Sequence, residues 1–221
     1  MYYKYPRTPH LPFSGSVTND DRVLPNTENF KNMNVVVTEK MDGENTTIYR
    51  DYYHARSIDS RHRDYHSYLL GTILPKVQYA IPEGYRVCGE YLYAKHSIQY
   101  NHLRDYFYVF SVWDDNNYCL DWDYVEEFCR YLGLFTVPIL YKGLYDEGII
   151  REIAKLKVDS GREGIVVRNY NSFHYNEFDK NIAKYVRPNH VQTDEHWSHG
   201  KIEINHLHKG VMYDRGKLVY Y

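Results

Sequence analysis

The sequence predicts an α+β domain built on antiparallel sheets with flanking helices. Short β-branched and aromatic runs follow one another with tight turns between them, which favours strands that pair with their sequence neighbours. Helical patterns lie between groups of these runs instead of alternating with every strand. The 221 residues fit one ordinary domain, and no internal repeat appears.

Eight segments have the β-branched or aromatic content of strands. Residues 85–93 and 106–113 are the most apolar, so we expect them to be buried. The other expected strands are residues 35–38, 45–49, 52–56, 137–141, 164–168 and 182–186.

Three segments have helical patterns. Residues 64–80 are expected to be helical with a break near Pro75, because proline lacks the backbone donor that a helix interior needs. Asp121 is suited to cap a helix that runs through Tyr131 and ends near Gly133. The third helix is expected over residues 147–158.

Composition shifts divide the chain into three parts. Residues 1–33 are rich in Pro, Asn, Asp and Thr, and we expect them to form an extended arm packed on the domain. The main domain is expected over residues 34–187. Residues 188–221 are polar and histidine-rich and predict a short C-terminal appendage without assigned elements.

Composition also limits the classes of function. No apolar run is long enough to span a bilayer, and the N-terminus lacks the apolar centre of a signal peptide. Three scattered cysteines argue against a disulfide framework and a cysteine zinc site, so we expect a cytoplasmic protein. The net charge of −2 excludes a generally basic coat but not a local basic groove. The 26 tyrosines fit either stacking on nucleic acid or ordinary packing.

One segment, residues 38–45, carries the clearest chemical signal. Lys40 ends an expected strand, and Gly43 permits a sharp turn into the next strand. This arrangement displays one amine at the rim of a sheet. A protonated lysine is a poor nucleophile, with an ordinary pKa of about 10.4, so nearby cations or desolvation must lower that pKa. Taken alone, the segment is better explained as a charged β-turn.

Five further segments follow in a fixed order. The full ordered set is residues 40–45, 54–57, 88–91, 106–110, 163–168 and 183–187. This set resembles the covalent nucleotidyltransferase superfamily of nucleic-acid ligases and mRNA capping enzymes. Within that superfamily it is most similar to the RNA ligase 2-type ATP-dependent RNA ligases. The resemblance implies that residues 34–187 form a nucleotidyltransferase (ATP-grasp-like ligase) domain for adenylation.

The resemblance also implies a reaction, its cofactors and its partner. Lys40 would attack the α-phosphate of ATP to form a covalent lysyl-adenylate. AMP would then pass to the 5′-phosphate of an RNA, and a 3′-hydroxyl would displace it to join the two ends. ATP and Mg²⁺ or Mn²⁺ are the expected cofactors. The protein is expected to act on RNA as a monomer, without a membrane.

Family roles carry over to individual positions. The catalytic set implied by the resemblance is Lys40, Asp42, Asn45 and Lys184. The implied nucleotide-binding set is Glu39, Lys40, Arg56, Glu90, Phe107, Glu163, Lys184 and Arg187. Within that set Phe107 would stack on adenine, Glu90 would contact the ribose, and Arg56 would hold a phosphate. Glu163 would place the metal.

Each role has a plainer alternative. Phe107 lies in an apolar run that is typical of core, with Val109 on the same face and Phe110 on the other. Arg56 fits a surface ion pair, and Glu90 and Glu163 fit charged strand ends. Arg187 stands one position later than the second lysine of the family's usual last motif.

The C-terminal end leaves further questions. Only 34 residues follow Arg187, which is too few for the OB-fold of DNA ligases and capping enzymes, so none is expected. A minimal DNA ligase with a partner clamp and a non-catalytic nucleotide- or RNA-end-binding module remain alternatives. His196 and His199, and His206 and His208, are spaced as pairs, but we expect solvated histidines rather than zinc ligands. Residues 190–197 resemble a segment of small RNA ligase-like proteins and receive no role.

Overall fold

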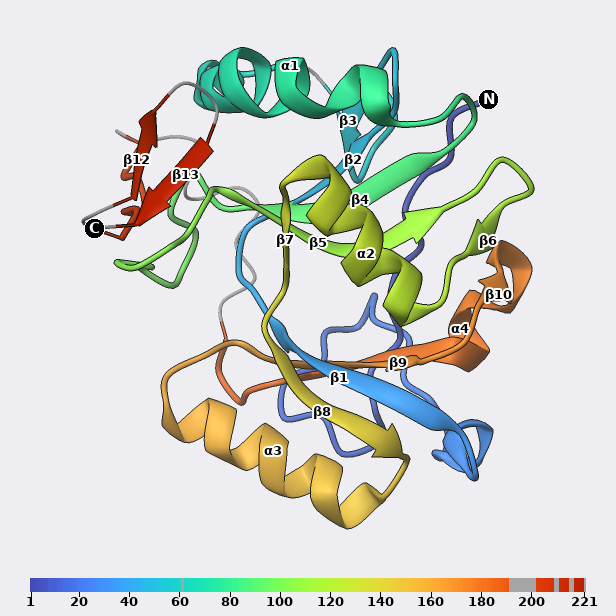
Figure 1. Cartoon of the computed structure of the whole chain (residues 1–221). Helices are drawn as coiled ribbons and strands as arrows, with labels where there is room; N and C mark the ends of the chain where they lie inside the picture. The colour runs from blue at the N-terminus through green and yellow to red at the C-terminus, as the bar shows by residue number, and fades with distance from the viewer. Residues whose placement is uncertain (61, 191–201, 209–210, 215–216, 221) are drawn as a thin grey trace.

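The computed structural model describes residues 1–60, 62–190, 202–208, 211–214 and 217–220, the last two ranges by their backbone alone. Its centre is a pair of sheets, of four and seven strands, with helices on their outer faces (Figure 1). This is the predicted α+β architecture. Among the described residues, no helix has the length and apolar character needed to cross a bilayer.

The four-stranded sheet has the order β11-β9-β1-β8 and is antiparallel throughout. Its strands are β1 (Asn34–Lys40), β8 (Ile139–Leu144), β9 (Gly164–Asn169) and β11 (Ile182–Val186). Val35 and Val37 pack with Ile150 of helix α3 (Glu147–Asp159), whereas Val36 points the other way and joins the largest core cluster. Alternating sides of β1 are therefore both buried, as its unbroken run of valines requires.

The larger sheet follows the path β10-β6-β5-β4-β2-β3. Its strands are β2 (Glu44–Ile48), β3 (Tyr53–Ala55), β4 (Arg86–Tyr91), β5 (Phe107–Trp113), β6 (Tyr118–Cys119) and β10 (Phe173–His174). The two-residue strand β7 (Phe135–Thr136) pairs with β5 in parallel, unlike the antiparallel ladders predicted. The short strands β6, β7 and β10 were not predicted, because two residues give no measurable alternation.

Helix α2 (Trp122–Leu132) lies beside β5 and β7 (Figure 1). The predicted caps of this helix are confirmed. The side chain of Asp121 accepts a hydrogen bond from the backbone N–H of Tyr124, and Gly133 takes the left-handed conformation with φ of 64°. The helix predicted over residues 147–158 is confirmed as α3, which begins after the capping residue Asp146.

The segment over residues 64–80 is helical, but not as predicted. It consists of short pieces, η2 (Asp64–His66), the π-helical η3 (Leu69–Ile73), α1 (Leu74–Val77) and η4 (Gln78–Ala80). Pro75 lies within α1 and does not end it. The preceding turn widens into a π-helix, so the proline falls in the first turn of α1, where its missing N–H is tolerated.

The strand predicted over residues 137–141 was wrong in its bounds. Pro138 lies between β7 and β8, and its carbonyl accepts a hydrogen bond from the backbone N–H of Glu39 at 2.8 Å. The register of β1 against β8 shifts at the same place, between Val37 and Thr38. The shift leaves Leu140 as an extra residue of β8, a β-bulge. Pro138, which cannot donate to a ladder, lies just before β8 begins.

Several short elements complete the chain. The arm residues Pro9 and Leu11 exchange backbone hydrogen bonds with Lys184, which places the arm beside β11. Small helical elements lie in the arm and before β11, and a hairpin lies near the C-terminus. They are η1 (Glu28–Phe30), η5 (Tyr175–Glu177), α4 (Phe178–Asn181), β12 (Val211–Asp214) and β13 (Lys217–Tyr220).

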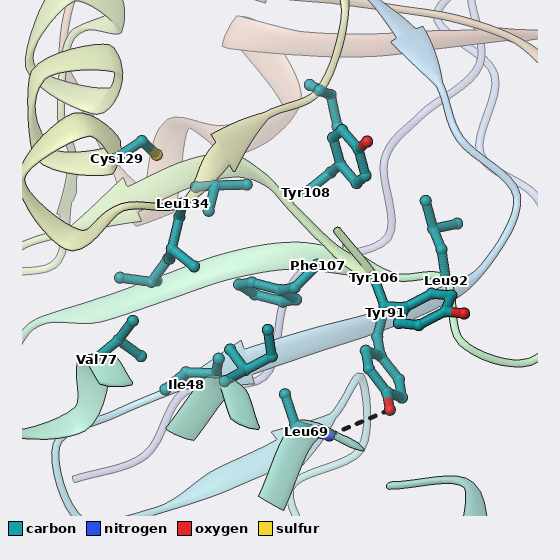
Figure 2. Close-up of a cluster of buried hydrophobic side chains, with 14 of the residues drawn as sticks. Ile48, Leu69, Val77, Tyr91, Leu92, Tyr106, Phe107, Tyr108, Cys129 and Leu134 are labelled. Carbon is teal, nitrogen blue, oxygen red and sulfur yellow. Dashed lines mark hydrogen bonds between the residues drawn. The ribbon is translucent and has the colours of Figure 1, made fainter. Parts of the chain in front are cut away.

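The largest core cluster lies between the seven-stranded sheet and the helices that cover it. Figure 2 shows Phe107 inside this cluster, with Ile48, Val77 and Leu134 around it. The hydroxyl of Tyr91 accepts a hydrogen bond from the backbone N–H of Leu69 at 3.2 Å, which ties the helical segment to β4. This rigid packing fixes the strands whose ends form the site.

Candidate active site

A cleft of about 970 Å³ opens where the edges of the two sheets meet. Strand ends from both sheets, the N-terminal arm and the segment after β11 line it. The lining residues that matter below are Asp21, Lys40, Asp42, Gly43, Asn45, Arg56, Glu90, Glu163, Lys184 and His190. Seven of the predicted site residues therefore share one cavity.

Lys40, the last residue of β1, presents its amine to the cleft. Its Nζ lies 2.6 Å from Oε1 of Glu163, and the Lys40 side chain is 24% exposed. The two residues face each other because Lys40 pairs with Gly164 in the β1–β9 ladder. Sheet register thus places a buried carboxylate directly against the predicted nucleophile.

The surroundings of Lys40 favour its charged form. Burial alone would lower the pKa of this amine, but nearby carboxylates outweigh burial and raise it above the ordinary value. Glu163 contributes most, followed by Glu90 and Asp42. The expectation that neighbouring groups of the protein lower the pKa of Lys40 was wrong. Without nucleotide or metal, the amine is held protonated.

Asp42 is anchored on one side and open on the other. Its Oδ2 accepts hydrogen bonds from the backbone N–H groups of Ser97 and Ile98 and from the Ser97 hydroxyl. Although burial opposes it, bonding from His190 and Ser97 keeps the pKa of Asp42 well below its usual range. Its Oδ1 faces Nε2 of His190 at 3.7 Å. Asp42 is therefore a fixed, ionised carboxylate whose Oδ1 faces His190 in the cleft.

Glu90 of β4 closes the turn between β1 and β2. Its Oε1 accepts a hydrogen bond from the backbone N–H of Gly43 at 3.0 Å. A Cβ at Gly43 would lie 2.6 Å from the carbonyl oxygen of Tyr91, so only glycine allows this close approach. Burial, and then the nearby carboxylates, raise the pKa of Glu90 to about 8.

Three side chains could hold a divalent cation. One oxygen each of Asp42 and Glu163 and one ring nitrogen of His190 lie within 4.8 Å of one another, and all three residues are buried. The second oxygen of Glu163, Oε2, is buried and has no hydrogen-bond partner among the described residues. Two carboxylates with an unsatisfied oxygen are suitable ligands for Mg²⁺ or Mn²⁺.

Lys184 lines the same cleft from β11, which lies two strands from β1 in the same sheet. Its Nζ lies 3.6 Å from Oδ1 of Asp21 in the arm. Asp21 also accepts bonds from the backbone and hydroxyl of Thr18, and faces His10 at 3.3 Å. Burial and Lys40 lower the pKa of Lys184. Burial, followed by Lys184, lowers the pKa of His10 to about 4, so His10 is neutral at pH 7.

A smaller cavity adjoins the cleft beneath Lys40. It is lined by Glu39, Lys40, Asn45, Glu90, Phe110, Val166 and Arg168, among others. Phe107 is not part of it: that ring is fully buried in the core and lines neither cavity (Figure 2). The expected stacking of Phe107 on adenine was wrong. Phe110, on the opposite face of β5, lines the smaller cavity instead, with the ring of Tyr5 beside it.

The remaining predicted residues lie in mixed positions. The carboxylate of Glu39 is paired with Lys157 at 2.9 Å and lines only the smaller cavity. Asn45 lines both cavities, and its buried Oδ1 has no partner among the described residues. Arg187 lies outside the lining of both cavities and contacts His190 instead.

Several site residues escaped sequence reasoning. They are Asp21, Ser97, Phe110 and His190. For Phe110 the signal was present, because period 2 places it opposite the core-facing Phe107. His196 and His199 lie outside the described residues, and His206 and His208 are exposed.

Comparison with known proteins agrees with this geometry. The sequence profile of RNA ligase matches residues 33–186. The chain belongs to the RNA ligase family. This match covers every predicted site residue except Arg187, which follows its last position. Sequence comparison with curated proteins gives no match.

Solved structures share the fold of this RNA ligase family chain. An archaeal ATP-dependent RNA ligase superposes with a TM-score of 0.61 at 17% identity, over 84% of this chain and 48% of its own. A Naegleria gruberi RNA ligase mutant with ATP and manganese gives 0.55 at 19%, over 84% and 60%. A presumed ATP-dependent DNA ligase from Aquifex aeolicus gives 0.59 at 22%, over 84% and 50%. The chain thus spans about half to three-fifths of the length of these proteins.

Proposed function

We propose that this protein is an ATP-dependent RNA ligase that joins 5′-phosphate and 3′-hydroxyl ends through a covalent adenylate on Lys40. One observation carries the proposal: in a chain of the RNA ligase family, the amine of Lys40 faces the cleft beside buried Glu163. Such an amine, held by two rigid strands, is suited to covalent catalysis.

The first step transfers AMP to the enzyme. Lys40 Nζ loses a proton, for which Glu163 Oε1 at 2.6 Å is an acceptor within reach. The amine then attacks the α-phosphorus of ATP, a nitrogen–phosphorus bond forms, and the bond to pyrophosphate breaks. Lys184, which lines the same cleft two strands away from Lys40, supplies positive charge to the phosphate oxygens.

The next two steps take place on RNA. An oxygen of the RNA 5′-phosphate attacks the AMP phosphorus, and the bond to Lys40 breaks. A 3′-hydroxyl then loses its proton and attacks the 5′-phosphorus, so that AMP leaves and a phosphodiester remains. Arg56, on the cleft wall after β3, is placed to bind one of these phosphates.

The base and the cation have their own candidate residues. Phe110 borders the smaller cavity beneath Lys40 and is the proposed platform for adenine. Asp42 and Glu163 are the carboxylates proposed to hold Mg²⁺ or Mn²⁺. When bound, the cation supplies positive charge that offsets these carboxylates and the phosphates.

The test separates the steps. Incubation with ATP labelled at the α-phosphate and Mg²⁺ should give a labelled protein on a denaturing gel, and Lys40→Ala should abolish it. Lys40→Ala should still seal RNA that already carries a 5′-adenylate, because that step does not use the amine. Lys180→Ala, an exposed lysine, is the matched control.

Two outcomes would contradict the proposal. Absence of any covalent label on the unaltered protein would favour a non-catalytic nucleotide- or RNA-end-binding module. Labelling followed by joining of nicked DNA but not of RNA ends would favour a DNA ligase instead. Parallel joining assays on RNA and DNA ends of the same sequence distinguish these alternatives.

A further inference from the structure

The segment after β11 forms a tight turn of four residues, Arg187-Pro188-Asn189-His190. The backbone N–H of His190 donates to the carbonyl of Arg187 at 3.4 Å. Proline at the second position and Asn189 at the third, with φ of 56°, are the pattern of a type II turn. The turn packs tightly against Gly15 of the arm: a Cβ added at Gly15 would lie only 2.5 Å from the Pro188 ring.

This turn returns His190 into the cleft. The side chain is buried, and its Nε2 lies 3.5 Å from Oε1 of Glu163 and 3.7 Å from Oδ1 of Asp42. The imidazole therefore stands between the two carboxylates proposed to hold the cation. His190 lies beyond residue 186, where the match to the RNA ligase family ends.

The contact on the other ring nitrogen indicates the tautomer. Nε of Arg187 faces Nδ1 of His190 at 3.4 Å. A guanidinium can only donate, so Nδ1 must accept, and the ring proton belongs on Nε2. A histidine that binds a metal through Nε2 needs a lone pair there. His190 is therefore arranged as a hydrogen-bond donor toward the carboxylates and not as a metal ligand.

We propose that His190 is a positioning residue, which holds the carboxylates of Asp42 and Glu163 in one orientation for a divalent cation. Two buried carboxylates this close repel each other unless a donor lies between them. Asp42 is already fixed through Oδ2 by backbone donors, whereas Glu163 is held only through Oε1, by the flexible side chain of Lys40, and its Oε2 has no partner among the described residues. His190 thus orients the less constrained carboxylate. This inference rests on the proposed function, since it concerns the cation of that reaction.

The test measures Mn²⁺ binding directly by electron paramagnetic resonance on the nucleotide-free protein. His190→Ala should weaken Mn²⁺ affinity by about 10- to 100-fold, the usual loss when a partner of a metal ligand is removed. His190→Gln, which retains a side-chain donor, should recover part of that affinity. His206→Ala, an exposed histidine, should bind as the unaltered protein does.

Two further measurements keep the proposal open to contradiction. Pulsed measurements on bound Mn²⁺ should show no coupling to a histidine nitrogen; a coupling that disappears in His190→Ala would make His190 a ligand and overturn the proposal. Equal Mn²⁺ affinity in His190→Ala and the unaltered protein would also overturn it. Binding is read without ATP, so failure of adenylation in the unaltered protein would refute only the proposed function.

A second pair of variants acts through the turn. Asn189→Val forces a β-branched residue into the left-handed region and should weaken Mn²⁺ binding with His190 still present. Asn189→Gly accepts the same conformation and should leave Mn²⁺ affinity unchanged. If His190→Ala fails to fold, the two Asn189 variants still test the proposal. Equal Mn²⁺ affinity in Asn189→Val and Asn189→Gly, whether weakened or unchanged, would contradict it.

Discussion

Two kinds of residue meet at the cleft, and they are held in place by different means. Lys40, Glu90 and Lys184 sit on strands whose backbone ladders fix them. Asp21 and His190 come from the arm and from the turn after β11, both outside the matched residues 33–186. Their positions depend on a few contacts, such as those of Thr18 with Asp21.

This difference separates the residues that take part in the proposed reaction from the residues that contact and adjust them. The strand-borne residues contain the nucleophile, the second lysine and Glu90, and the carboxylates of Asp42 and Glu163 lie within two residues of a strand end. The loop-borne residues contact those groups without replacing them: Asp21 faces Lys184, and His190 faces Glu163. Changes on the strands or directly at their ends should therefore remove activity, whereas changes in the arm and in the turn after β11 should shift affinities.

The largest effect is expected for Glu163→Gln. The substitution keeps the shape of the side chain but removes the charge beside Lys40 and a proposed cation ligand. Loss of several kcal/mol of charge stabilisation corresponds to about a 100-fold or greater fall in the adenylation rate. Single-turnover labelling at saturating ATP measures it, with the exposed Glu152→Gln as control.

The pH dependence of the same variant identifies the cause. In the unaltered protein the carboxylates raise the pKa of Lys40, so the amine is protonated at neutral pH and adenylation should rise as pH increases. Glu163→Gln removes the strongest of these influences, and its profile should shift toward lower pH. An unshifted profile would mean that Glu163 does not control the protonation of Lys40.

Two aromatic residues of β5 should lose different properties when they are replaced by alanine, and both losses should be smaller in effect on the reaction than that of Glu163→Gln. Phe107→Ala should lower the free energy of unfolding by about 3–5 kcal/mol, because its ring is fully buried. Phe110→Ala should instead weaken ATP binding by about 1–3 kcal/mol, the usual value of a base stacked on an aromatic ring. Denaturant unfolding and calorimetric titration of ATP measure the two; weakened ATP binding by well-folded Phe107→Ala would reverse the assignment.

The sequence predicts the strand-borne part of the molecule well. The valine run of β1, the Asp121 and Gly133 caps of α2 and the rim position of Lys40 all follow from local patterns, and the structure has them. It predicts the loop-borne part poorly. Nothing local to Asp21 reveals that Lys184 lies opposite it, because the two are brought together only when the arm pairs with β11.

Phe107 illustrates a second limit. Alternation along β5 separates its two faces but does not say which face meets the core, since that depends on the partner sheet. His190 lies between these cases. Its turn is readable from the Pro-Asn pair, but the carboxylates it reaches come from distant segments.

The smallest effect is expected for Asp21→Asn, which should tighten ATP binding instead of weakening it. The Asp21 carboxylate lies 3.6 Å from Nζ of Lys184, the lysine proposed to meet the phosphates, so it repels incoming ATP and partly neutralises that lysine. Its charge is present at neutral pH, since Thr18 and Lys184 outweigh burial and lower the pKa of Asp21 to about 2. Removing one such charge several ångströms from the nucleotide should tighten ATP binding by about threefold at low salt, and less as salt rises.

Calorimetric titration of ATP into a Lys40→Ala background measures binding without reaction. Asp159→Asn, the same charge change on an exposed side chain that lines neither cavity, is the control and should leave ATP binding unchanged. Weaker ATP binding in Asp21→Asn would mean that the arm orients Lys184 for the nucleotide instead of competing with it.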